Sequence, residues 1–62
     1  MKIRDAIRII ESDGWKLART RGSHRQYRHP LKPGTVTVAG HQSIDLDRKT
    51  QASILKQAGL KP

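Results

Sequence analysis

The fold is set by the stretch Gly22-Ser23-His24-Arg25-Gln26-Tyr27, because it contains a turn between two segments that each predict a strand. The Gly-Ser pair, with Arg21 before it, is a short turn signal, and residues 24–29 behind it predict a strand that Pro30 ends. Before the turn, residues 15–20 alternate between two faces, which predicts a strand whose apolar face points inward at its start, where Trp15 lies in the core. The two segments therefore predict a β-hairpin.

The rest of the chain supplies a third strand and two helices. Residues 35–38 are β-branched with a period of two and follow a Lys-Pro-Gly turn signal. An apolar stripe at helical spacing predicts a helix over residues 3–13 that ends at Gly14. A second helix is expected from Asp47, a favoured N-cap residue, to Gly59. The order α-β-β-β-α predicts an α+β fold, with a three-stranded antiparallel sheet and both helices on one face.

Strand parity sorts the side chains of the second strand. If Tyr27 packs beneath the helices, Arg25 and His29 share its side of the sheet. The opposite, solvent-facing side then carries His24, Gln26 and Arg28. His24 is therefore expected to be exposed and flanked by cations.

Length and composition limit the possible functions. A chain of 62 residues predicts one small domain covering residues 1–62, too small for a deep substrate cavity. It has no cysteine, so it forms no disulfide and no Cys-based zinc site. Its apolar runs are far shorter than the roughly 20 residues that cross a bilayer, and no signal-peptide pattern is present. We therefore expect a soluble, cytoplasmic protein that does not bind membranes.

The charge points to a polyanionic partner. Thirteen Lys and Arg against five Asp and Glu give a formal net charge of +8. On so small a domain, this much charge of one sign costs self-repulsion unless an anion neutralises it. A nucleic acid is therefore the favoured partner.

His24 is the candidate for proton transfer. An imidazole exchanges protons near neutral pH, so it can act as general base or acid in phosphodiester transfer. A base that takes the proton of a ribose 2′-OH lets that oxygen attack the adjacent phosphorus, and nearby cations stabilise the phosphoryl charge without a metal or other cofactor. The residues expected to contact RNA are Arg21, Ser23, Arg25, Arg28 and Lys32. From these residues alone, however, an exposed histidine among arginines is more often a phosphate or base contact than a catalyst.

The other histidines and two aspartates receive different interpretations. The spacings of His24, His29 and His41 match no standard zinc pattern, so no metal site is predicted. We interpret His29, at a strand end, as a surface or capping residue, whereas His41 either contacts substrate or solvates its loop. Asp45 and Asp47 precede the second helix and are interpreted as N-terminal capping residues.

Several segments together carry a family resemblance. They are an amphipathic start followed by Gly14-Trp15, the Gly22-Ser23-His24 turn with Tyr27 three residues on, residues 36–41, and Thr50 with residues 53–60. In this order and spacing they resemble the HicA toxin family of small bacterial and archaeal toxin-antitoxin modules. The resemblance extends from the first helix to Pro62.

The resemblance implies a fold like that of double-stranded-RNA-binding domains, ribonuclease activity on mRNA that arrests translation, and neutralisation by a cognate HicB-type antitoxin. It also implies that His24 is the catalytic histidine of the family, whereas the roles of the arginines and Lys32 rest on charge. The resulting prediction is the toxin of a type II toxin-antitoxin system. It would be a metal-independent endoribonuclease with His24 as general acid or base.

Two other function classes stay open. A non-catalytic double-stranded-RNA-binding module would share the fold and the charge, because such modules recognise the shape and phosphates of the duplex. Against this, a pure binder has no reason to prefer His over Lys or Arg at position 24. A DNA-binding or protein-interaction domain would use the basic surface on an acidic partner, but the sequence contains no recognisable helix-turn-helix pair.

Overall fold

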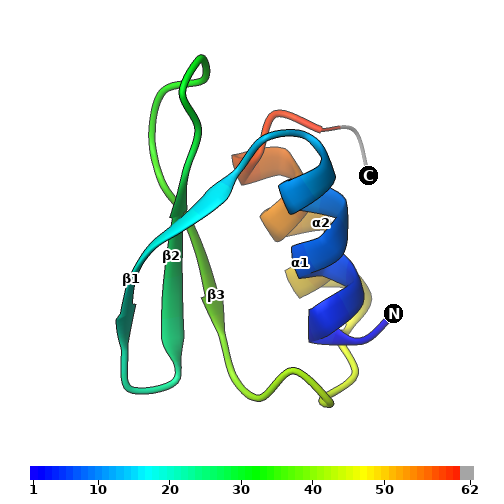
Figure 1. Cartoon of the computed structure of the whole chain (residues 1–62). Coiled ribbons are helices and arrows are strands. Elements are labelled where there is room, and N and C mark those ends of the chain that lie inside the picture. Colours follow the sequence, from blue (N-terminus) through cyan, green and yellow to red (C-terminus); the bar gives the residue numbers. More distant parts are fainter. Residues whose placement is uncertain (61–62) are drawn as a thin grey trace.

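Two helices cover one face of a three-stranded antiparallel sheet in the computed structural model, which describes residues 1–60 (Figure 1). The elements in chain order are α1 (Ile3–Ser12), β1 (Lys16–Arg21), β2 (His24–Arg28), β3 (Val36–Ala39) and α2 (Arg48–Gln57). The strands lie in the order β1-β2-β3, and both neighbouring pairs are antiparallel. The predicted α-β-β-β-α topology and α+β class are confirmed.

Local signals set the ends of both helices. The Asp5 side chain accepts a hydrogen bond from the Lys2 backbone N–H (2.9 Å) at the start of α1. Asp47 is the N-cap of α2, and its carboxylate accepts a hydrogen bond from the Thr50 N–H (2.9 Å). Gly14, which lies just beyond α1, has a φ of +111°, a conformation that other residues rarely adopt. The predicted N-cap at Asp47 is confirmed.

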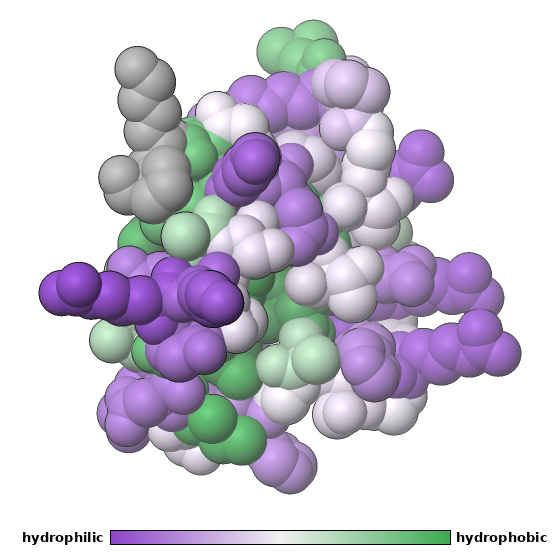
Figure 2. Space-filling model, turned by 180° about the vertical axis from the view of Figure 1, so that it is seen from behind, coloured by the Kyte–Doolittle hydropathy of each residue, from purple (hydrophilic) through white to green (hydrophobic). Residues whose placement is uncertain are grey.

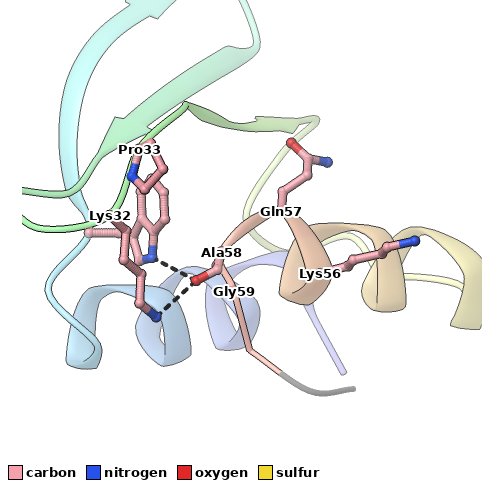
Figure 3. A pocket seen from close by; sticks show the side chains of 7 residues that line it. Lys32, Pro33, Lys56, Gln57, Ala58 and Gly59 are labelled. Carbon is pink, nitrogen blue, oxygen red and sulfur yellow. Dashed lines mark hydrogen bonds between the residues drawn. The ribbon is translucent and has the colours of Figure 1, made fainter.

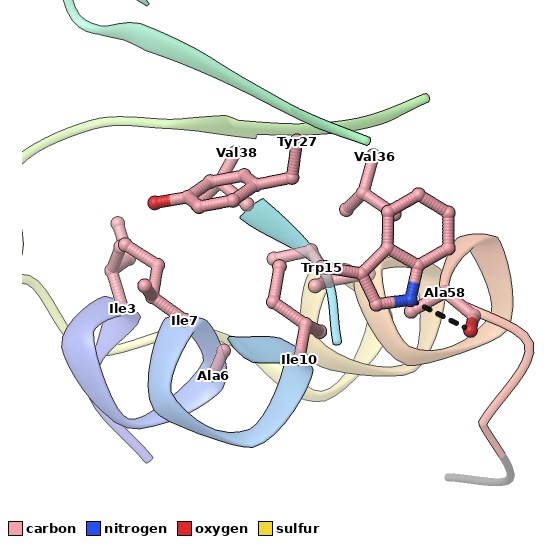
Figure 4. Packing of buried hydrophobic residues seen from close by; sticks show 10 residues of the cluster. Ile3, Ala6, Ile7, Ile10, Trp15, Tyr27, Val36, Val38 and Ala58 are labelled. Carbon is pink, nitrogen blue, oxygen red and sulfur yellow. Dashed lines mark hydrogen bonds between the residues drawn. The ribbon is translucent and has the colours of Figure 1, made fainter. Parts of the chain in front are cut away.

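The core lies between the helices and the sheet (Figure 4). The apolar stripe of α1 packs there, as its spacing predicts, and Trp15 is 1 % exposed. The inward residues of the strands complete this layer, and they include Tyr27, Val36 and Val38. Burial of its ring raises the pKa of the Tyr27 hydroxyl. Burial of these large apolar side chains supplies the main driving force for folding.

The sheet is not covered evenly. All residues of β1 are exposed, whereas β3 buries Val36 and Val38 beneath the helices. Leu17, which pairs with the buried Tyr27, is still 51 % exposed, because β1 is the edge strand farther from the helices (Figure 1). β1 therefore lies at the margin of the core, whereas β2 contributes Tyr27 to it.

A β-bulge corrects the predicted side-chain pattern of β1. Regular alternation places Leu17 and Arg19 on the same inward face, but the register shifts between these two residues. Leu17 pairs with Tyr27, while Arg19 pairs with Gln26 on the opposite face. The extra residue of the bulge therefore turns Arg19 toward solvent.

Several boundaries also differ by one residue from those predicted. β1 begins after Trp15 and includes Arg21, so only Gly22 and Ser23 form the turn. β2 ends at Arg28, which leaves His29 outside the strand. Neither α1 nor α2, the two helices in residues 1–60, is long or apolar enough to cross a membrane.

Candidate functional site

His24 occupies the first position of β2, directly after the hairpin turn. Gly22 has a φ of +59° while Ser23 has a negative φ, the pattern of a type II′ turn with glycine at its first central position. His24 is exposed, and its Cα pairs with Arg21 on one side and with Ala39 on the other. The turn therefore presents the imidazole to solvent from the middle strand of the sheet.

The sheet face that carries His24, here called the open face, points away from the helices. Side chains of directly opposed residues share a face, so the register assigns its members. They are Lys16, Arg19, Arg21, His24, Gln26, Arg28, Thr37 and Ala39. Residues 14–44 contain six Lys and Arg and no Asp or Glu. Long hydrophilic side chains project on this side of the sheet in Figure 2, and the charged members of the open face are all cations.

The structure brings only some of the expected RNA contacts to His24. Arg21 is its cross-strand neighbour on the open face, and Ser23 precedes it in the turn. Arg28 shares the open face but lies at the other end of β2. Arg25 points to the helix side, where its Nη1 donates a hydrogen bond to the Gly40 carbonyl (3.0 Å).

Lys32 belongs to a structural network at the opposite end of the sheet (Figure 3). Its ammonium forms an ion pair with Asp13 and donates a hydrogen bond to the Ala58 carbonyl (3.1 Å). Trp15 Nε1 donates to the same carbonyl (3.2 Å), at the C-terminal end of α2. The hydrogen bond from Lys32 lowers the pKa of Asp13. The structure therefore does not bring Lys32 to His24, and its ammonium is already engaged by Asp13 and Ala58.

A shallow pocket of about 340 Å³ lies at this same end of the sheet (Figure 3). It is lined by Trp15, Lys32, Pro33, Lys56, Gln57, Ala58 and Gly59. The pocket is separated from His24 by the length of β2, because it adjoins the loop that leaves the far end of that strand. It therefore takes no part in the site around His24.

His29 is enclosed rather than at the surface, which corrects part of the prediction. Its side chain is 7 % exposed, and its ring contacts Trp15 edge-on with centroids 5.3 Å apart. Nδ1 accepts hydrogen bonds from the backbone N–H groups of Leu31 and Lys32, which confirms a capping role. Nε2 lies 2.7 Å from the Asp13 carbonyl, so the network assigns the ring proton to Nε2. Both ring nitrogens are thereby engaged.

The loop between β3 and α2 contains the third histidine and two aspartates. His41 is exposed in this loop. Asp45 forms an isolated β-bridge with Lys2 and lies two residues before the N-cap of α2, so it does not cap the helix as predicted. Asp47 caps α2 as predicted, and hydrogen bonding from Thr50 lowers the pKa of its carboxyl group.

Sequence reasoning missed two cations of the open face, Lys16 and Arg19. The alternation of residues 15–20 could have identified Lys16. It lies between Trp15 and Leu17, which were expected to point inward, so its own side chain was expected to point to the opposite face. Arg19 carried no such signal, since the bulge reverses the alternation at that point. With Arg21 and Arg28, these two residues give the open face four cations.

Comparison with known proteins places the chain in a family. No individual curated protein matches the chain. A family model described as the HicA toxin of bacterial toxin-antitoxin matches residues 3–60. This match spans every helix and strand of the structure, including the hairpin turn that presents His24. The chain therefore belongs to the HicA toxin family of bacterial toxin-antitoxin systems.

Proposed function

We propose that this chain is the toxin of a type II system and cleaves mRNA without a metal, with His24 as the group that transfers protons. Family membership supports a ribonuclease activity and implies a cognate antitoxin. The observation that carries the proposal is the exposure of His24 on a sheet face whose charged side chains are all cationic. A phosphodiester attracted to this face meets an imidazole beside the cations that hold it.

The reaction uses the nucleophile that RNA itself contains. His24 accepts the proton of a ribose 2′-OH, and the resulting oxygen attacks the adjacent phosphorus. Arg21, directly across the strand pair from His24, stabilises the negative charge that gathers on the phosphoryl oxygens. The absence of acidic residues between positions 14 and 44 means that no neighbouring carboxylate in this segment repels the substrate.

The remaining cations extend the contact surface. Arg19 lies on the open face next along from Arg21, and Lys16 and Arg28 lie at its far end, where these cations bind phosphates on either side of the cleaved bond. Ser23 offers a hydroxyl from the exposed turn. These groups contact the RNA backbone rather than the base edges, so they position the strand without specifying its sequence.

A HicB-type antitoxin covers the same face in this proposal. Its acidic groups lie against the arginines of the open face, because complementary charge both speeds association and blocks access to His24. In a cleavage assay, adding the antitoxin then suppresses the reaction, and added salt slows the onset of suppression. Suppression that is insensitive to salt would contradict this electrostatic account.

The decisive experiment incubates the protein with a long single-stranded RNA and a metal chelator, and detects the fragments. His24→Ala is expected to reduce the cleavage rate by about 10²-fold or more, the usual contribution of a general acid or base. His24→Lys is the matched variant, because it keeps a cation for phosphate but holds its proton at neutral pH. We expect His24→Lys to bind RNA and fail to cut it.

The same experiment distinguishes the ribonuclease from the second candidate function. A non-catalytic double-stranded-RNA-binding module would bind RNA duplexes and cut nothing, whichever residue occupies position 24. Unchanged cleavage by both variants would remove His24 from the mechanism.

A further inference from the structure

The loop that follows β3 is fastened to the hairpin turn beside His24. The Gly40 N–H donates a hydrogen bond to the Ser23 carbonyl (3.1 Å), so the loop and the turn share a backbone contact. Arg25 adds a second link through its hydrogen bond to the Gly40 carbonyl. Two bonds on the same residue therefore fix the start of this loop.

The other end of the loop is fastened to α1. The Gln42 carbonyl accepts a hydrogen bond from the Arg4 N–H (3.1 Å), and the His41 carbonyl accepts one from the Ile44 N–H (3.1 Å). His41 thus lies between two anchored points, while its own side chain is exposed. The backbone that carries this imidazole is held in place although the imidazole faces solvent.

The register brings His41 close to His24. His24 pairs directly with Ala39, and such pairs place their Cα atoms about 5 Å apart. His41 is two residues beyond Ala39, which adds at most about 7 Å. The two histidine Cα atoms are therefore within about 12 Å of each other. Both side chains are exposed, and two that start this close together are able to reach the same phosphodiester.

The proposed reaction needs a second proton-transfer group. When the 2′ oxygen displaces the 5′ oxygen from phosphorus, the departing oxygen must gain a proton while His24 is taking one. Residues 14–44 offer no carboxyl group, and arginine guanidinium groups stay protonated. His29 has both ring nitrogens engaged at the opposite end of β2. His41 is the remaining imidazole in this segment.

We infer that His41 is a second catalytic residue, the general acid that protonates the leaving 5′ oxygen; this inference rests on the proposed ribonuclease function. In the step, the bond between the 2′ oxygen and phosphorus forms as the bond from phosphorus to the 5′ oxygen breaks. The 2′-OH proton passes to His24, and a proton passes from His41 to the 5′ oxygen. The products are a 2′,3′-cyclic phosphate and a 5′-hydroxyl end, and exchange with water restores both histidines.

Arg25 acts as a positioning residue in this arrangement. Its guanidinium contacts the carbonyl of Gly40, the residue immediately before His41, rather than lying on the open face. Loss of this hydrogen bond loosens the loop on the side that faces the hairpin. The Arg25 side chain therefore sets the distance between the two imidazoles without touching RNA.

The test compares two RNAs that differ in one atom. Both carry the same cleavage site, but in one the leaving 5′ oxygen is replaced by a bridging sulfur, whose thiolate departs without needing a proton. His41→Gln is expected to cut the normal RNA about 10²-fold more slowly than the unaltered chain, and the sulfur-containing RNA at nearly the unaltered rate. His24→Ala is expected to lose activity on both RNAs.

Matched variants separate this role from folding. Gln42→Ala changes the neighbouring side chain but keeps the backbone carbonyl that bonds to Arg4, so both RNAs are expected to be cut normally. Arg25→Ala is expected to show a weaker form of the His41→Gln pattern, and Arg25→Lys to restore activity in part. Thermal unfolding of each variant accompanies the assay.

Each outcome of this test either supports or overturns the proposed role of His41. A His41→Gln variant that cuts both RNAs at the unaltered rate, or loses the same factor on both, overturns the role of His41 as general acid. Failure of the unaltered chain to cut either RNA overturns the proposed function, and the inference with it. Activity of the unaltered chain together with selective rescue by sulfur supports both.

Discussion

The two ends of β2 hold histidines with opposite surroundings. His24 opens the strand in an exposed turn, whereas His29 follows its last residue and is almost fully enclosed. His29 bonds through both ring nitrogens to backbone groups, while the ring of His24 faces solvent on the cationic open face. The same residue type is therefore exposed at one end of the strand and built into the hydrogen-bond network at the other, and its surroundings decide which.

The cations repeat this contrast. Arg19 and Arg21 lie on the open face near the turn, with no acidic residue in the strands. Lys32, at the other end, is bound to Asp13 and to the C-terminal end of α2. Net charge alone suggests that these cations are equivalent, but only the open-face group is free to attract phosphate.

The largest expected effect is a difference in stability between the two histidine variants. His29→Ala removes a buried ring and leaves two backbone N–H groups and the Asp13 carbonyl without their partner. We expect a loss of about 2–3 kcal/mol in the free energy of unfolding. His24→Ala, at an exposed position, is expected to change it by less than about 0.5 kcal/mol. Urea unfolding of both variants measures this difference. Equal losses of unfolding free energy would contradict the structural role assigned to His29.

A smaller effect is expected on RNA binding. Arg19→Ala removes one phosphate contact, so a plot of log binding constant against log salt concentration is expected to lose about 0.7 from its slope on single-stranded RNA. Lys32→Ala is the matched variant, because it also removes one positive charge but from the structural end. We expect Lys32→Ala to leave the slope nearly unchanged. A larger change for Lys32 than for Arg19 would contradict the assignment of the open face.

The smallest effect is expected in the pH dependence of stability. Lys32 holds the folded-state pKa of Asp13 below its usual value of 3.8, so the folded protein binds this proton less readily than the unfolded chain. The resulting stabilisation is fully present above the unfolded pKa and is lost as the pH falls through the folded pKa. Asp13→Asn is therefore expected to be less stable near neutral pH, with a difference that narrows below about pH 4.

Asp47→Asn is the control for this measurement. Its carboxyl pKa is lowered too, so its difference from the unaltered chain also narrows at low pH, but asparagine keeps an oxygen for the cap and the difference near neutral pH is expected to be smaller. Unfolding followed from pH 7 to pH 2 distinguishes the two variants. A constant difference between Asp13→Asn and the unaltered chain across this range would show that the Lys32 pair contributes no pH-dependent stability.

Much of the fold follows from local signals. The apolar stripe of α1, the Gly22-Ser23 turn, the β-branched run of β3 and the Asp47 cap each act over a few residues. Their preferences therefore survive in the folded protein and can be recognised without it. With Tyr27 taken to pack beneath the helices, strand parity likewise predicted the exposure of His24, because alternation within β2 is uninterrupted.

The errors occurred where distant segments meet. Nothing near Ala18 marks a bulge, since the register of β1 is settled by its pairing with β2. His29 is enclosed because Trp15 and the end of α1 pack against it, 14 and 16 residues away in the chain. Lys32 is held by the ends of both helices, which a pattern around residue 32 cannot reveal.

The sequence by itself determined the order of elements, the excess of positive charge and the turn that exposes His24, because these depend on short-range preferences and on composition. Only the tertiary structure decided which cations share the face of His24, which histidine is enclosed, and that His41 lies in a loop fastened beside the turn. These outcomes depend on contacts between segments far apart in the chain. Such contacts exist only when the helices and the sheet pack together.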